Sequence, residues 1–341
     1  MTSAIEADDL VKRFKGGVLA LDGVSFAVEQ GSVFGLLGPN GAGKTTAVRI
    51  LTTVLAADGG RARVLGHDVA RHPEVVRSLF GLAGQNAAVD ENLTGRENLQ
   101  MIGRLNHLSR ASARARAAEL LGEFGLVEAA ERSLKTYSGG MRRRLDVAAA
   151  LVSRASVLFL DEPTTGLDPQ SRAELWSVIE RLVEGGTTVL LTTQYLEEAD
   201  RLASRLAVVD RGRVISQGTP AELKAALGRT VLEIDLRDAA VAELAARAVA
   251  PLSGGAAGVY GSSVELPAGG GPRTAMEALR ALDREGIEPL RMVLREPSLD
   301  DVFLALTGHR AEEGATSPGD GGARGDGQAP RSPSAGAGAA R

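Results

Sequence analysis

Three short apolar runs divide the first part of the chain into strand and helix patterns. They lie at Val33–Leu37, Val157–Leu160 and Thr188–Leu191. Each is almost continuously apolar, which is typical of a short strand buried on both faces. Helical patterns follow, the first of them over residues 45–53. Up to about residue 225, this alternation predicts an α/β fold with a parallel sheet flanked by helices.

Two other regions have patterns of their own. Residues from about 86 to 154 are rich in helical stretches, which are Gly95–Leu108, Ser112–Phe124 and Met141–Ser153. From about residue 226 to 308 a smaller mixture of strands and helices predicts an accessory α+β domain. Its expected strands are Thr230–Leu236, Ser262–Leu266 and Leu290–Leu294, and its expected helices are Ala239–Val249 and Thr274–Glu285. Residues 309–341 are rich in Gly, Pro and Ser, which predicts a disordered tail.

Composition limits the possible functions. A chain of 341 residues is long enough for about two domains. Its formal net charge is −4, so no overall basic field would attract nucleic acid, and we expect no such partner. Cysteine is absent, which excludes disulfides and fits a reducing cytosol. The sequence has neither a signal-peptide core nor the ~18–20 apolar residues of a membrane span. If this protein drives transport, it therefore has to recruit a membrane partner.

A phosphate-binding loop follows the first apolar run. The pattern Gly-x4-Gly-Lys-Thr lies between a predicted strand and a predicted helix. The candidate ATP-binding residues here are Gly38, Pro39, Asn40, Gly41, Ala42, Gly43, Lys44, Thr45 and Thr46. Lys44 would reach the β- and γ-phosphates, and the Thr45 hydroxyl would ligate Mg²⁺. The alternative is a glycine-rich turn with an incidental lysine, and the flanking strand and helix make it the weaker interpretation.

An acidic pair follows the second apolar run. Asp161 comes at the end of the predicted strand, in the same sheet as the loop, and can hold Mg²⁺ through water. Glu162 is next along the chain, so it points differently and can act on an attacking water as general base. Aspartate and proline are also common in turns after strands, and Pro163 follows here. The loop upstream favours the metal and base roles over a plain turn.

A third motif, Tyr137-Ser-Gly-Gly-Met141, precedes the helical stretch that starts at Met141. Ser138, Gly139 and Gly140 at a helix N-terminus can form a second anion cradle, although the same residues also make an ordinary helix cap. With the two motifs above, this order resembles the ATP-binding subunits of ABC transporters, whose usual signature is LSGGQ. The resemblance covers roughly residues 5–225 and implies an ATP-binding domain over residues 1–225, with a helical subdomain inserted at about 86–154.

The resemblance also assigns roles to single residues. Phe14 occupies the place of the aromatic residue that stacks on adenine, although it would also fit as an ordinary hairpin aromatic. Gln85 resembles the loop glutamine that senses Mg²⁺ and the membrane partner. Asp168 lies in the loop that touches the opposing subunit. Gln194 stands where the family normally has a histidine that contacts the γ-phosphate. Glutamine can donate a hydrogen bond but cannot carry a proton.

Several stretches resemble the daunorubicin-resistance branch of ABC drug exporters. They are SGGMRRRL, VDENLTGRENL, the glutamine at 194 and PSLDDVFLALTG. The resemblance implies a peripheral ATPase on the cytoplasmic face of the membrane that pairs head to tail with a second copy. It would power export of a drug or antibiotic-like molecule through a separate multi-span permease. A soluble ABC ATPase or an ATP-sensing module is the alternative. We interpret Arg142–Arg144 as the solvated face of the signature helix, and we prefer this to the alternative of a contact with phosphate or a lipid headgroup.

Overall fold

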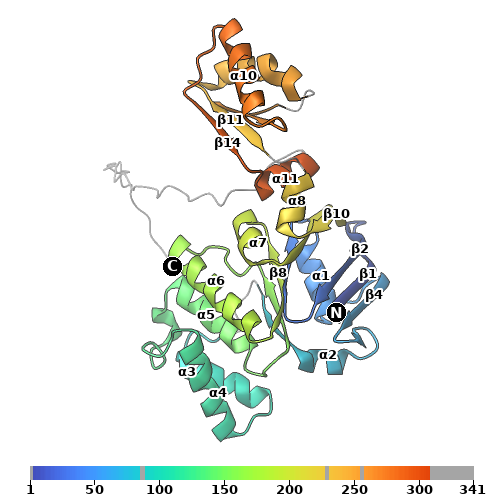
Figure 1. Ribbon diagram of the computed structural model, residues 1–341. Coiled ribbons are helices and arrows are strands. Elements are labelled where there is room, and N and C mark those ends of the chain that lie inside the picture. The colour runs from blue at the N-terminus through green and yellow to red at the C-terminus, as the bar shows by residue number, and fades with distance from the viewer. Residues whose placement is uncertain (1–2, 85–88, 227–229, 254–256, 308–341) are drawn as a thin grey trace, which may run out of the picture.

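We describe the protein from a computed structural model (Figure 1), which describes residues 3–84, 89–226, 230–253 and 257–307. Gln85, to which the family resemblance assigns a role, lies outside these ranges. So does the tail at 309–341, which is predicted to be disordered. Within them, no helix is long and apolar enough to cross a membrane.

A six-stranded sheet forms the centre of the first 225 residues. Its strands run parallel except for the edge strand β10, which pairs antiparallel with β9. In spatial order they are β10 (Arg213–Gly218), β9 (Arg205–Asp210), β3 (Val33–Leu37), β8 (Thr188–Thr193), β7 (Val157–Asp161) and β6 (Phe80–Ala83). All five residues of β3 are buried, as are all five of β7. The continuous apolar runs therefore predicted these central strands correctly.

Helices lie beside this sheet, and all but the last of them, α8, fall between its strands in sequence (Figure 1). They are α1 (Lys44–Leu51), α2 (Pro73–Leu79), α3 (Gly95–Leu105), α4 (Arg110–Glu123), α5 (Gly139–Ala150), α6 (Pro169–Glu184), α7 (Leu196–Leu202) and α8 (Pro220–Ala226). The short 3-10 helix η1 (Leu134–Thr136) precedes α5. Helices α3, α4 and α5 all lie between β6 and β7 in sequence, so the helix-rich stretch forms an insertion between two neighbouring strands.

The two faces of the central sheet pack against different layers, because successive residues of a strand point to opposite sides. Leu158 and Leu160 of β7 belong to one core, which also contains buried residues of α5 and α6. Val157 and Phe159 of the same strand belong to the other core, with buried residues of α1. The sheet is thus a middle layer. Loops follow the carboxyl ends of its parallel strands, which is where ligands bind in open α/β sheets.

The second core is closed by a separate antiparallel sheet, which the sequence patterns did not distinguish from the first. Its strands, in spatial order, are β2 (Leu19–Glu29), β1 (Ser3–Arg13), β4 (Gly59–Val64) and β5 (His67–Asp68). Phe26 of β2 stacks on Phe34 of β3 with ring centroids 5.3 Å apart, which ties the two sheets together. Strands β1 and β2 form the hairpin that presents Phe14 in its turn.

The C-terminal part has its own sheet and its own core. Its strands, in spatial order, are β12 (Gly258–Tyr260), β13 (Ser263–Pro267), β11 (Val231–Asp235) and β14 (Arg291–Arg295). Helices α9 (Ala239–Val249) and α10 (Pro272–Arg284), with the 3-10 helix η2 (Ala250–Ser253), cover it. Figure 1 shows this unit standing apart from the central sheet, with α8 and α11 (Leu299–Thr307) between them. The predicted limits of 1–225, 226–308 and 309–341 stay a prediction.

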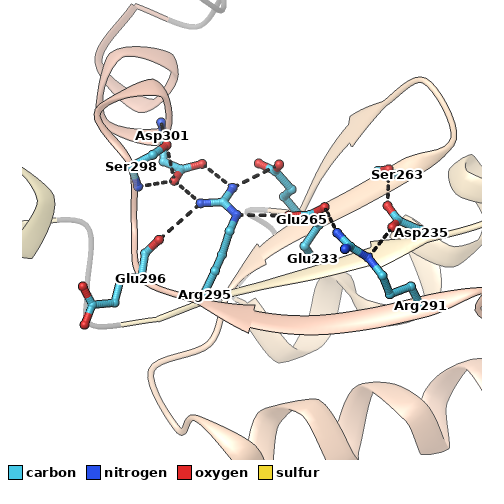
Figure 2. A network of polar contacts seen from close by, with 9 residues as sticks. All are labelled: Glu233, Asp235, Ser263, Glu265, Arg291, Arg295, Glu296, Ser298 and Asp301. Carbon is cyan, nitrogen blue, oxygen red and sulfur yellow. Dashed lines mark hydrogen bonds and ion pairs between the residues drawn. The ribbon is translucent and has the colours of Figure 1, made fainter. Parts of the chain in front are cut away.

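Helix α11 joins the C-terminal unit to the rest of the chain. Its side chains Val302 and Phe303 are buried in one cluster with Leu37, at the end of β3, and Leu196, at the start of α7. The attachment of α11 to the C-terminal sheet is polar (Figure 2). Arg295 of β14 donates from Nη2 to Asp301 Oδ1 at 2.9 Å and also forms ion pairs with Glu233 and Glu265. The helix is therefore fixed on one side by apolar packing and on the other by ion pairs.

Candidate functional site

The predicted phosphate loop connects β3 to α1 and is shaped for a ligand that approaches along the backbone. Gly43 is the N-cap of α1, with φ 108°, in the left-handed region that favours glycine. A Cβ at Gly43 would also strike the carbonyl oxygen of Ala20, at the start of β2. Pro39 accepts a hydrogen bond from the Ala42 N–H at 3.2 Å, which closes the turn. Thr45 and Thr46 lie in the first turn of α1, where backbone N–H groups have no partner within the helix.

Lys44 lies inside this loop with its side chain only 3% exposed. Its Nζ donates to the carbonyl oxygens of Gly38 at 2.7 Å and Pro39 at 3.1 Å. The same ammonium lies 3.2 Å from Glu162 Oε1, whose side chain is also largely buried. Burial lowers the pKa of Lys44, and the nearby Glu162 carboxylate partly offsets that effect. The two residues that were assigned to phosphate and to water therefore share one site.

Asp161 lies at the end of β7 and connects three segments through one carboxylate oxygen. The Thr45 hydroxyl lies 3.1 Å from Asp161 Oδ1 and donates to it, across 116 positions of sequence. The Thr192 hydroxyl of β8 donates to the same oxygen at 2.6 Å. Hydroxyl and carboxylate oxygens are the ligands that Mg²⁺ prefers. No cluster of three His, Cys, Asp or Glu side chains that could hold a metal occurs in the described part of the chain.

Glu162 has an uncommon backbone conformation. Its φ is 50°, in the left-handed region, which is costly for a residue other than glycine. Its N–H is shared between the carbonyl oxygen and the hydroxyl of Thr192, each at 3.1 Å. This turn directs the Glu162 side chain to Lys44 rather than along the direction of β7. Strained positions of this kind cluster at functional sites.

The predicted signature segment forms the first turn of α5. Ser138 is the N-cap and accepts from the Met141 N–H at 3.2 Å. Gly140 packs so closely on Ser171 of α6 that a Cβ there would collide with its side chain. Ser171 is in turn held by Asp168, the N-cap of α6, which accepts from its N–H at 2.9 Å. The structure therefore brings Asp168 beside the signature turn, and Ser138 and Gly139 are exposed to solvent there.

Tyr137 replaces the leucine of the family signature. Its ring is buried, and its hydroxyl donates to the Ala129 carbonyl at 2.7 Å. Burial raises the pKa of this hydroxyl. The hydroxyl also lies so close to Gly95 that a Cβ on Gly95 would collide with it. Tyr137 thus anchors the signature turn to the start of α3.

The remaining predicted residues lie around these segments. Phe14 is 40% exposed in the β1–β2 turn, which leaves its ring accessible for stacking. Gln194 follows β8, and its Oε1 is buried without a hydrogen-bond partner among the described residues. Buried polar atoms are normally paired, so this oxygen is available to a further donor. Gln85 lies outside the described residues.

The interpretation of Arg142–Arg144 as a solvated face is wrong for Arg143 and Arg144, whereas the side chain of Arg142 is 38% exposed. Arg143 is 13% exposed and donates to backbone carbonyls of Gly84, Asp161 and Pro163. Arg142 donates to the carbonyls of Leu134 and Lys135, and Arg144 pairs with Glu174 at 3.2 Å. Because the guanidinium of Arg143 is used by backbone groups of the chain, the alternative phosphate or lipid contact does not describe it either. The rule that short charge runs are exposed fails here because backbone carbonyls from distant segments converge on Arg143 and accept hydrogen bonds from it.

Comparison with known proteins places this site in a family. The ABC transporter family model matches residues 21–165, which include the phosphate loop, the signature turn and the acidic pair. The daunorubicin resistance ATP-binding protein DrrA2 of Streptomyces coeruleorubidus is 54% identical over 91% of this chain and 96% of its own length. The chain belongs to the ABC transporter family. It is an ABC ATPase of the daunorubicin-resistance branch.

Two further relatives agree with this assignment. The doxorubicin resistance ATP-binding protein DrrA of Mycobacterium tuberculosis is 49% identical over 86% of this chain and 90% of its own length. A solved ATP-binding subunit of an ABC transporter is 28% identical and superposes with a TM-score of 0.59, covering 66% of this ABC ATPase and 93% of the solved chain. The predicted α/β fold of a phosphate-loop ATPase is therefore confirmed.

Sequence reasoning missed one residue of the ABC ATPase site and misjudged another. Thr192 lies beside Asp161 in the register of β7 and β8, so the pairing of two adjacent parallel strands was the signal that could have found it. Arg143 was noticed and given the wrong environment. None of these contacts is visible in a motif read along one segment.

We expect Gln194→His to preserve or raise the rate of ATP hydrolysis. An imidazole at this position can donate to a phosphate oxygen as the amide does and can also carry a proton. The variant should also make the rate depend on pH near neutrality, where histidine titrates. Phosphate release measured across pH 6–8 for both proteins tests this. A collapse of the rate would mean that the glutamine itself is required.

Proposed function

We propose that this ABC ATPase powers the export of a drug or antibiotic-like molecule through a separate membrane permease. The observation that carries the proposal is the 54% identity to a daunorubicin resistance ATP-binding protein over nearly the whole of both chains. A doxorubicin resistance protein at 49% identity supports the same cargo class. ATPases of this family work as dimers with a membrane permease. The proposed location is the cytoplasmic face of the membrane, where ATP is available and a multi-span permease offers its inner side.

The proposed reaction is hydrolysis of ATP at a site shared by two copies paired head to tail. Lys44 and the α1 N-terminus of one copy would bind the β- and γ-phosphates. Ser138, Gly139 and Gly140 of the other copy would bind the γ-phosphate from the opposite side, next to Asp168. The solvent-exposed signature turn supports this arrangement, since a second chain can reach it. Phe14, accessible in its turn, would stack on adenine.

Within this composite site Glu162 would act as general base on the attacking water. Its carboxylate lies 3.2 Å from the phosphate-binding ammonium of Lys44, so a water between it and the γ-phosphate is within reach. Gln194 would contact the γ-phosphate through its amide. Loss of the γ-phosphate removes the group that both copies hold, so the dimer reopens, and this two-state change would be passed to the permease.

Mg²⁺ fits the donor set beside the loop. Thr45 would ligate it directly, and Asp161 would hold it through water. Their oxygens are 3.1 Å apart, and phosphate and water would supply further ligands, as is usual for Mg²⁺. When bound, the ion would neutralise charge on the phosphates. Gln85 remains a proposed third contact.

Drug accumulation in cells tests the proposed export. The chain is expressed in a drug-sensitive bacterium with a multi-span membrane protein that co-purifies with it, and intracellular daunorubicin is followed by its fluorescence. We expect lower accumulation with the pair than with either protein alone, and no effect with Lys44→Ala. If no membrane protein co-purifies and accumulation is unchanged while the purified protein hydrolyses ATP, a soluble ABC ATPase is the better description. An ATP-sensing module would bind ATP and release no phosphate.

A further inference from the structure

The side chain of Arg143 joins the signature helix to the chain on both sides of Glu162. From α5, its Nε donates to the Pro163 carbonyl at 2.8 Å and its Nη2 to the Asp161 carbonyl at 3.2 Å. Its Nη1 donates to the Gly84 carbonyl, just after β6, at 2.6 Å. Asp146, one turn along α5, pairs with Nη1 at 3.0 Å and orients the guanidinium. One planar fork therefore meets three carbonyls from two neighbouring strand ends.

These contacts lie beside a residue whose backbone conformation needs support. Glu162 has a φ of 50°, and such a conformation persists only where the surroundings hold it. Its N–H is held by Thr192, as described above. Arg143 binds the Asp161 carbonyl, which is in the peptide unit directly before Glu162, and the Pro163 carbonyl, which is one peptide unit further on than the Glu162–Pro163 bond. The chain is thus fixed from the signature helix directly before Glu162 and again one residue after it. Glu162 and Arg143 line one surface pocket together with Gly139 of the signature turn.

We propose that Arg143 is a positioning residue for ATP hydrolysis, which acts by holding the carbonyls of Asp161 and Pro163, the residues before and after Glu162, so that the Glu162 carboxylate stays directed at the nucleotide site. The inference rests on the proposed role of Glu162 as general base. It adds a physical link between the signature helix and the base of the same chain. A movement of α5 would move both carbonyls, and Glu162 with them.

The neighbouring arginines supply matched controls. Arg144 lies on the same helix one residue further on and is similarly buried, with 18% of its side chain exposed. Its contacts go to Glu174 on α6 and to the Phe124 carbonyl at 3.4 Å, neither of which adjoins Glu162. A loss of helix packing or of a buried cation would appear in both Arg143→Lys and Arg144→Lys. A loss of base positioning would appear only in the first.

The test measures single-turnover ATP cleavage per bound ATP in the full-length protein, together with ATP affinity from a fluorescent-nucleotide titration. In Arg143→Lys, a single ammonium keeps the charge next to Asp146 but cannot span three carbonyls. We expect the cleavage rate to fall about 10- to 100-fold, the loss that follows a misplaced catalytic group. Affinity should change less than about threefold, since no ATP contact is removed. Arg144→Lys should retain both values. Rates per bound ATP are insensitive to unfolded material, and Arg143→Gln provides a second variant.

A double-mutant comparison decides whether Arg143 acts through Glu162. In a Glu162→Gln background no base remains to be positioned, so adding Arg143→Lys should produce no further loss of rate. The proposal is overturned if Arg143→Lys lowers the rate by the same factor in both backgrounds, if affinity falls as much as rate, or if the rate is unchanged. Failure of the proposed function gives a different result, because Glu162→Gln by itself would then retain the wild-type rate.

Discussion

Replacing Lys44 by alanine is expected to abolish ATP binding and turnover. The ammonium is the only lysine group in the described part of the phosphate loop, and it already lies in the site with its side chain buried. A hydrogen bond to a charged group contributes about 1.5–3 kcal/mol, so losing even one such contact lowers affinity by about 10- to 150-fold. The change also leaves Glu162 without its cation, in a place where its side chain is only 10% exposed.

Equilibrium dialysis with ATP and a phosphate-release assay measure both effects of Lys44→Ala. Lys224→Ala is the matched control. Lys224 lies on α8 and forms an ion pair with Asp200 of α7 at 2.6 Å, and we assign Lys224 no role in the site. The control should bind and hydrolyse ATP like the unchanged protein. Turnover near normal in Lys44→Ala would contradict the assignment of the phosphate loop.

Replacing Glu162 by glutamine is expected to leave ATP binding intact and to stop cleavage. Glutamine has the same shape but cannot accept the proton of an attacking water at neutral pH. General base catalysis contributes about 10²- to 10⁴-fold, so single-turnover cleavage should fall by that order. Because the γ-phosphate then persists, the closed dimer should accumulate with ATP.

Size-exclusion chromatography with and without ATP, next to a cleavage assay, measures this pair of effects. Glu180→Gln is the matched control, since Glu180 pairs with Arg201 between α6 and α7 and faces solvent. It should behave like the unchanged protein. Slow cleavage without any ATP-dependent dimer would mean that the base is assigned correctly and the pairing is not. Undiminished cleavage would remove Glu162 from the role of base.

Much of the fold could be predicted because local patterns agree with the tertiary environment. The run at Val33–Leu37 is apolar throughout and has the bounds of β3, since a strand buried on both faces shows no alternation. Ser138 was recognised as a helix cap, and α9 has its predicted bounds. The hairpin around Phe14 was expected, but its pairing with β4 into a separate antiparallel sheet was not, because strand periodicity does not tell which strands pair. The three-residue strand β12 is too short to leave a pattern.

The site was predictable in its parts and less so in its connections. Lys44, Thr45, Asp161 and Glu162 were found from motifs, and the structure adds that Lys44 pairs with Glu162 and that Thr45 donates to Asp161. Thr192 and Arg143 were not assigned roles because their partners are backbone and side-chain groups of segments far away in sequence. In the same way, Phe303 packs against Leu37 across more than two hundred positions. Contacts of this kind follow from topology and not from local sequence.

The central claim is that each ATP site is shared by two chains, and a mixing experiment tests it most directly. Lys44→Ala inactivates the phosphate loop of one copy. Gly139→Asp places a negative charge in the exposed signature turn of the other copy. The substitution at Gly139 is compatible with the fold, since a Cβ there meets only Leu167 at an ordinary 4.0 Å. Each variant by itself should be inactive. In a mixed dimer, the intact loop of the Gly139→Asp copy faces the intact signature of the Lys44→Ala copy.

Phosphate release is measured for each variant and for their equimolar mixture, after subunit exchange has been verified by native mass spectrometry. We predict that the mixture recovers activity well above the sum of the two variants, up to about a quarter of the unchanged protein if pairing is random and symmetric. A mixture with verified mixed dimers and no more activity than that sum would contradict a site shared between two chains.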